Sequence, residues 1–308
     1  MSAMSARTTA PGNLLPPDIF RMSSPPSNIK SLLEPVLENA HSGQPNHTMS
    51  SSSYSPDSSP HPLSVITIIA YVVLIVPTFY IWRRHGRPGF LAWNFVYALC
   101  AIRITGAALS IAAERNASLG TAAAIVNSIA ISPLLLAALG VSHEARRARI
   151  ADLNAKREWR GVWCLHAVVT TGMILVIVGI VKVVEDESST AESVLIKAGM
   201  GVLVAAYVVL LLWTIVSMRQ PFLARSETVM DGTILLRTNL MTLPFIGLRL
   251  VWGVVSSLLA YNGVDHLWDM NIIAGSMPEI VATVMFVIGG FRTRNMYASC
   301  RREIPSKA

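Results

Sequence analysis

Seven long apolar runs follow one another along this chain, and short polar stretches separate them. Each run holds roughly 18 to 24 residues, and about 20 helical residues at 1.5 Å each cross the hydrocarbon core of a bilayer. A spanning segment has no water to satisfy its backbone, and these runs lack the alternation of a barrel strand. The runs cover residues 64–82, 90–113, 119–140, 161–182, 194–217, 238–261 and 272–291.

Composition agrees with this class of protein. The 308 residues are 52% hydrophobic and only 14% charged, which is too apolar for an ordinary soluble domain. The sequence therefore predicts an all-α, polytopic bundle of seven transmembrane helices, with the lipid bilayer as its partner. We expect it in the plasma membrane or an endomembrane.

Basic residues gather in alternate connections and predict the orientation of the bundle, because Lys and Arg accumulate on the cytosolic side. The basic positions are Arg83, Arg84 and Arg87, then Arg146, Arg147, Arg149, Lys156, Arg157 and Arg160, then Arg219, Arg225 and Arg237, and finally Arg292, Arg294, Arg301, Arg302 and Lys307. The opposite connections hold Arg115 alone, then Lys182 beside acidic residues, and then no basic residue. We therefore expect the N-terminus outside and the C-terminus in the cytosol. Since topology accounts for the net charge of +7, no nucleic acid is expected as a partner.

Three regions follow along the chain. Residues 1–62 are rich in Ser and Pro and poor in aromatic residues, a composition typical of a disordered, here extracytoplasmic, tail. Residues 63–292 are the transmembrane domain, and residues 293–308 form a basic cytosolic tail. The sequons at Asn46 and Asn116 both fall on the predicted outer side, so the protein is expected to be a glycoprotein.

A few polar residues interrupt the apolar runs, and such residues often serve a site within the membrane. At about 1.5 Å per residue, Arg103 lies roughly 20 Å and Arg249 roughly 16 Å above the cytosolic boundary. Counted the same way, Glu279 lies roughly 10 Å below the outer boundary. These depths nearly coincide in a core about 30 Å thick, and Asn127 falls on the same level. The four side chains are predicted to share one layer in the outer half of the membrane.

Two interpretations of this layer stay open. In the first, Arg249 pairs with Glu279 and ties two neighbouring helices together, while Arg103 binds backbone carbonyls or Asn127. In the second, two cations and one carboxylate line a cavity for a small anionic or carbonyl-bearing ligand. Prolines in three of these helices, which open and kink a helical backbone, favour the cavity. They are Pro133, Pro244 and Pro278.

Three well-known seven-helix chemistries do not fit the sequence. A retinal protein needs a Lys in its last helix, and residues 272–291 contain none. The motifs common to G-protein-coupled receptors are replaced by Gly140-Val141-Ser142-His143-Glu144 and Met277-Pro278-Glu279. Zinc-dependent seven-helix hydrolases bring several histidines into their helices, whereas here only His166 lies within a predicted span. No cofactor or metal site is therefore expected.

The chain does resemble a fungal family of seven-helix integral membrane proteins known only as a domain of unknown function. The likeness covers roughly residues 63 to 295. It lies in Arg84-His85-Gly86, Arg103-Ile104-Thr105-Gly106-Ala107, Ile131-Ser132-Pro133-Leu134-Leu135-Leu136 with Leu139-Gly140, Leu243-Pro244-Phe245 with Leu248-Arg249-Leu250, and Pro278-Glu279. The resemblance implies a membrane protein but transfers no catalytic residue.

The hypothesis that remains is a non-enzymatic, receptor-like or transport-related bundle that binds a small molecule. The alternative is an intramembrane enzyme acting on a lipid-like or terpenoid substrate. Glu279 would then be its acid or base, because a carboxyl group removed from water can hold and donate a proton. Pairing with Arg249 would oppose that role.

Overall fold

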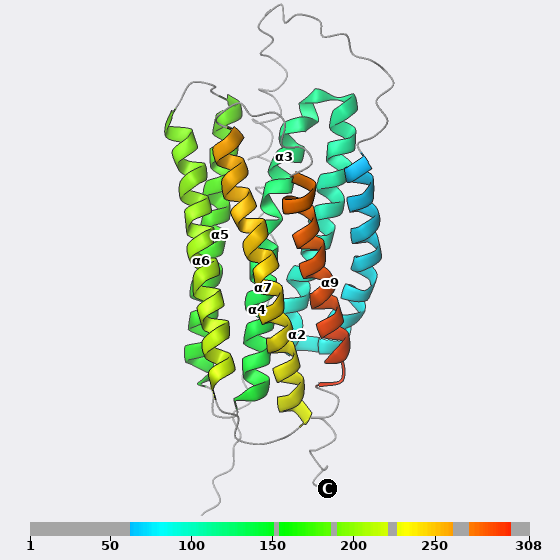
Figure 1. Ribbon diagram of the computed structural model, residues 1–308, viewed down its shortest axis with the longest axis vertical. Coiled ribbons are helices and arrows are strands. Elements are labelled where there is room, and N and C mark those ends of the chain that lie inside the picture. The colour runs from blue at the N-terminus through cyan, green and yellow to red at the C-terminus, as the bar shows by residue number, and fades with distance from the viewer. Residues whose placement is uncertain (1–61, 151–153, 186–189, 221–226, 261–270, 297–308) are drawn as a thin grey trace, which may run out of the picture. The chain divides into compact units, whose positions relative to one another are not determined.

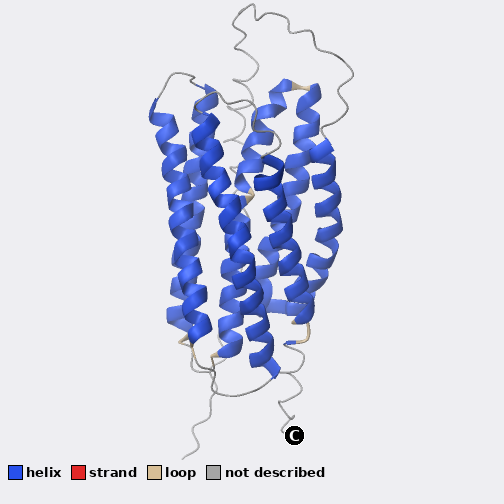
Figure 2. Ribbon diagram, viewed as in Figure 1, coloured by secondary structure: helices blue, strands red, loops and turns tan. Residues whose placement is uncertain are grey.

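The computed structural model describes residues 62–150, 154–185, 190–220, 227–260 and 271–296. Within these residues the chain is helical and contains no strand (Figure 2). The chain divides into two compact units, Met1–Pro56 and Asp57–Ala308. The first unit lies outside the described residues, and the second holds the helical bundle.

Six long helices and one short one build the described part of the bundle (Figure 1). They are α2 (Pro62–Arg115), α3 (Gly120–Ile129), α4 (Ile131–Arg149), α5 (Ala155–Glu185), α6 (Thr190–Arg219), α7 (Glu227–Ala260) and α9 (Met277–Arg292). A 3-10 turn, η2 (Ala117–Leu119), precedes α3, and a π-helical segment, η3 (Asn271–Ser276), precedes α9.

The described residues contain seven helical segments long and apolar enough to cross a membrane. They are Leu63–Gly86, Gly89–Arg115, Gly120–Arg149, Ala155–Lys182, Val194–Arg219, Val229–Ser256 and Ala274–Arg292. The predicted all-α bundle of seven membrane helices is thus confirmed.

Two of these spans belong to α2, because the chain reverses at Gly86. Its φ of 61° and ψ of −150° lie in a region that glycine alone enters readily. We call Leu63–Gly86 the N-terminal arm of α2 and Gly89–Arg115 its C-terminal arm.

The three prolines expected to kink helices act differently from one helix to the next. Pro133 and Pro278 lie in the first turns of α4 and α9, where a missing N–H breaks no helical hydrogen bond. They therefore start new helices after the turn at Ala130 and after η3. Of the three, Pro244 alone lies in the interior of a helix.

Helix α4 is the centre of the bundle and packs against α2, α5, α6 and α7. In the third span 67% of the most apolar stretch is buried, compared with 17% in the first. Gly140 permits a close approach of two helix backbones, because a Cβ there would lie 2.6 Å from the backbone N and Cα of Ala92. The absence of a side chain thus lets α4 touch the backbone of α2.

Two predicted boundaries are wrong at the end of the bundle that carries Gly86. Helix α4 continues to Arg149 rather than stopping near residue 140, and both Arg146 and Arg149 are buried. The sixth span begins at Val229 rather than at residue 238, so Arg237 lies inside α7 and not in a connection. The membrane face that this end meets stays a prediction.

Candidate functional site: a buried charge cluster

One carboxylate inside the bundle receives hydrogen bonds from three other side chains. Glu279 has no exposed surface, and its Oε1 accepts a hydrogen bond of 2.9 Å from the Tyr71 hydroxyl. Arg103 donates from Nε to Oε1 and from Nη2 to Oε2. Arg249 donates from Nε to Oε2 over a longer 3.4 Å. We refer to these four residues as the charge cluster.

Four separate segments bring the charge cluster together. Tyr71 comes from the N-terminal arm of α2, Arg103 from its C-terminal arm, Arg249 from α7 and Glu279 from the first turn of α9. The fork of Arg103 matches the two carboxylate oxygens, which makes a directional and strong pair. A carboxylate also gains from the partial positive charge at a helix N-terminus.

The cluster contains two cations and one anion, and the two arginines are not equivalent. The Arg249 side chain is 15% exposed and that of Arg103 is 8% exposed. Within the described residues, the bond to Glu279 is the one hydrogen bond of Arg249, so its Nη1 and Nη2 groups keep their donors free. Arg249 is therefore the open member of the cluster.

The structure brings three of the four expected residues together. The expected contact between Arg249 and Glu279 is present. Arg103 binds Glu279, so its assignment to backbone carbonyls or Asn127 is wrong. Asn127 instead donates from Nδ2 to the Ser110 hydroxyl at 3.2 Å, which ties α3 to the C-terminal arm of α2. A ligand-binding role for these four residues stays a prediction.

A second buried pair, which the sequence reasoning missed, lies at the Gly86 end. His85 Nδ1 is 2.7 Å from Glu144 Oε1, and the Trp93 indole donates to Oε2 of the same carboxylate at 3.2 Å. The His85 Nε2 atom lies 3.3 Å from the Gly290 carbonyl, which can only accept. This pair ties α2, α4 and α9 together.

The end of α4 makes polar contacts on several sides. Asn239 of α7 donates to the Ser142 hydroxyl at 2.7 Å, and Arg146 donates from Nε to Glu158 of α5 at 2.7 Å. Ser142, Arg146 and Glu144 lie beyond the last residue of the predicted apolar run, where hydropathy alone predicts a solvated loop. A signal was nonetheless available, since residues 141–149 contain neither Gly nor Pro and can continue the helix.

The glycosylation predictions fall partly outside the described residues. Asn46 lies outside them, as do most of the predicted tails at residues 1–62 and 293–308. Asn116 directly follows α2 and is exposed. Its Oδ1 accepts hydrogen bonds from the backbone N and the hydroxyl of Ser118 at 3.2 and 2.8 Å. Glycosylation at either site stays a prediction.

Most of the chain matches one protein family. The model of one family, described as Domain of unknown function (DUF7702), matches residues 58–296. The chain belongs to this family. The match confirms the predicted membership of a family of unknown function. The matched residues include all four residues of the charge cluster. The fungal origin stays a prediction. Neither the curated proteins nor the solved structures give a significant match.

Proposed function

We propose that this DUF7702 protein is a receptor-like or transport-related membrane protein that binds a small anionic or carbonyl-bearing molecule at Arg249. One observation carries the proposal, namely the free Nη1 and Nη2 donors of a guanidinium group inside the described bundle. A charged group within a membrane is costly and gains from a partner. A ligand with an anionic or carbonyl oxygen would accept hydrogen bonds from the Nη1 and Nη2 groups of Arg249, whereas Glu279 accepts only from Nε.

The surroundings of Arg249 support a site that can open. The arginine holds Glu279 by one long hydrogen bond, whereas Arg103 holds the same carboxylate twice. Helix α7 carries Pro244 in its interior, and α9 begins after the π-helical segment η3. Interior prolines kink helices, and π-helical turns are frequent at functional sites.

The enzyme alternative has less support from the geometry. A general acid or base must lie within hydrogen-bond reach of its substrate. Both oxygens of Glu279 already accept hydrogen bonds from other side chains, and the residue has no exposed surface. The carboxylate is thus better suited to holding the arginines in place than to meeting a substrate.

The test measures thermal unfolding of the purified protein in lipid nanodiscs, with sodium acetate and inorganic phosphate as probes. A ligand at 100 times its Kd stabilises the folded state by about 2.7 kcal/mol. We expect at least one probe to raise the unfolding temperature of the wild type accordingly. Arg249→Gln should abolish this increase in unfolding temperature. Arg237→Gln is the matched control, because Arg237 is an exposed arginine of the same helix. Equal stabilisation of the wild type and Arg249→Gln by every probe would refute the proposal.

A further inference from the structure

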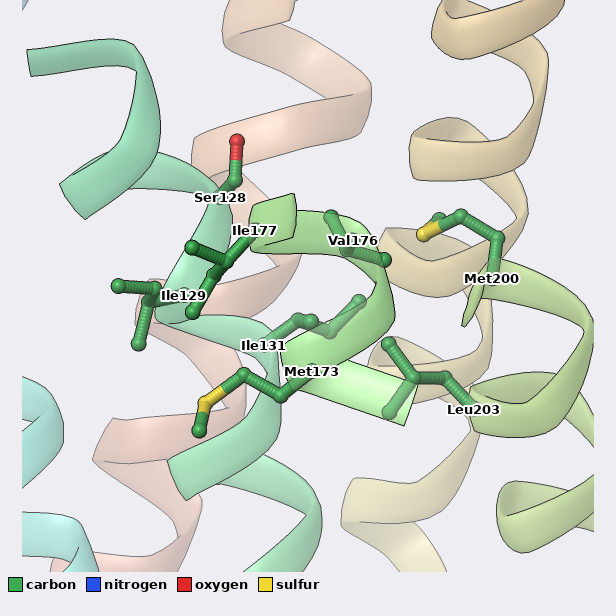
Figure 3. Close-up of a pocket in the computed structure, with 8 residues that line it drawn as sticks. All are labelled: Ser128, Ile129, Ile131, Met173, Val176, Ile177, Met200 and Leu203. Atoms are coloured by element: carbon green, nitrogen blue, oxygen red, sulfur yellow. The ribbon is translucent and has the colours of Figure 1, made fainter. Parts of the chain in front are cut away.

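A small apolar cavity lies where α5 and α6 meet the break between α3 and α4 (Figure 3). Its volume of about 10 Å³ is close to the room needed for one water molecule. Ser128, Ile129, Ile131, Met173, Val176, Ile177, Met200 and Leu203 line it. The single hydroxyl among them, that of Ser128, already donates to the Ala124 carbonyl at 2.8 Å. The lining side chains are therefore suited to an apolar guest.

Met200 connects this cavity to the charge cluster. In Figure 3 it extends from α6 at one edge of the cavity. A Cβ built on Gly253 of α7 would lie 2.7 Å from Met200 Cε and 3.8 Å from Arg249 Nη1. The methionine methyl group and the open guanidinium group thus meet over the same glycine. The Met200 side chain therefore borders the apolar cavity and also comes near Arg249.

Methionine is suited to such a position because its unbranched side chain turns about three bonds and tolerates displacement. Gly253 has no side chain of its own to fill the space beside Met200. A thioether turned away from Gly253 would leave space beside both the cavity and Arg249. Such a space would be polar beside Arg249 and apolar beside the cavity.

We propose that the ligand of this site is a short amphiphile with a carboxylate or carbonyl head and an unbranched apolar body. The head binds Arg249, and the body replaces the Met200 side chain and enters the cavity between α5 and α6. The inference rests on the function proposed above and adds the chemical class of the ligand. Three heavy atoms of Met200 beyond its Cβ, together with one water-sized cavity, set the body at about four carbon atoms.

The experiment uses a chain-length series of acetate, butyrate, hexanoate and octanoate on the full-length protein in nanodiscs. The apparent Kd comes from the shift in thermal unfolding, and the Arg249→Gln result is subtracted to remove partition into the bilayer. We expect the affinity to rise about four-fold per added methylene group until the ligand fills the space available to it, and then to level off.

Two substitutions test the path itself. Met200→Ala empties the space that the ligand body would occupy, so the body no longer has to displace the thioether. The affinity for butyrate and hexanoate should therefore rise, while the chain length at which the affinity levels off should stay at about four carbon atoms. Gly253→Ala places a methyl group where the body would pass, and should abolish the gain with chain length. Gly201→Ala is the matched control on α6, because a Cβ there meets nothing within 4 Å, and it should behave as the wild type.

The outcomes separate this inference from the function on which it rests. If acetate and octanoate bind equally well and both depend on Arg249, the amphiphile inference is wrong and the anion site stands. If stabilisation by the carboxylates and by inorganic phosphate is the same in the wild type and in Arg249→Gln, the proposed function is wrong as well. A chain-length series that is identical in the wild type, Met200→Ala and Gly253→Ala would overturn the path past Met200.

Discussion

Removal of the Glu279 charge is predicted to be the most damaging single change in the charge cluster. Glu279→Gln leaves Arg103 and Arg249 facing one another in a low-dielectric interior without the counter-charge that they share. Loss of one partner from a buried ion pair costs about 3–5 kcal/mol. Folded proteins are stable by only about 5–15 kcal/mol, so this one variant should lose much of its stability.

The geometry ranks the remaining variants. Arg103→Met should be intermediate, since Glu279 keeps Tyr71 and Arg249 as partners. Arg249→Met should be milder, because the fork of Arg103 remains. Tyr71→Phe removes one hydrogen bond within the membrane, which is worth about 0.6 kcal/mol on average. The double variant Arg103→Met with Glu279→Gln should be less damaged than the sum of its single changes, by about 1–3 kcal/mol.

The assay is equilibrium unfolding of purified variants in mixed micelles, with the fraction unfolded followed by circular dichroism. Each single variant is compared with the wild type, and the coupling free energy comes from the double-mutant cycle. Additivity within about 0.5 kcal/mol would mean that Arg103 and Glu279 do not interact. An Arg249→Met variant as unstable as Glu279→Gln would equally refute the ranking.

Three further predictions concern packing, topology and the tail. Gly140→Ala should lower the unfolding temperature sharply, because its Cβ would strike the backbone of α2, while Gly201→Ala should leave it unchanged. Asn46→Gln should remove a glycan, seen as a shift in gel mobility, whereas Asn116→Gln need not, since Asn116 directly follows a span. On intact cells, an N-terminal tail that is protected from external protease would contradict the predicted orientation. Deletion of residues 1–48 should leave membrane insertion nearly intact in a fractionation assay.

The apolar runs were enough to predict the spans, because their length follows from the thickness of the bilayer. Depth counting also placed Arg249 beside Glu279, since position along a helix axis depends only on the residue count. Depth says nothing about rotation around that axis. For this reason Asn127, which was expected on the same level, turns toward Ser110, and Arg103 proved to be the closer partner of Glu279.

Other members of the polar interior could not be found by searching apolar runs for charges. Tyr71 carries no charge and looks like an ordinary residue of an apolar helix. His85 and Glu144 lie beyond the predicted ends of their runs, where polar residues are normally solvated. Their burial depends on α4 continuing to Arg149 in the middle of the bundle, which is a property of tertiary packing rather than of local hydropathy.

The positions of the two polar clusters bear on where the bundle would open for the proposed ligand. The N-terminal arm of α2 carries Tyr71 and His85, which lie fourteen residues and therefore about 21 Å apart. Tyr71 is hydrogen-bonded to Glu279, and His85 is hydrogen-bonded to Glu144. This arm is fixed at both ends, so its displacement would break both clusters. Helix α7 is joined to the charge cluster by one hydrogen bond of 3.4 Å from Arg249. An opening between α6 and α7 at the level of Arg249 would therefore disturb the charge cluster least, and this is the level at which Met200 and Gly253 meet.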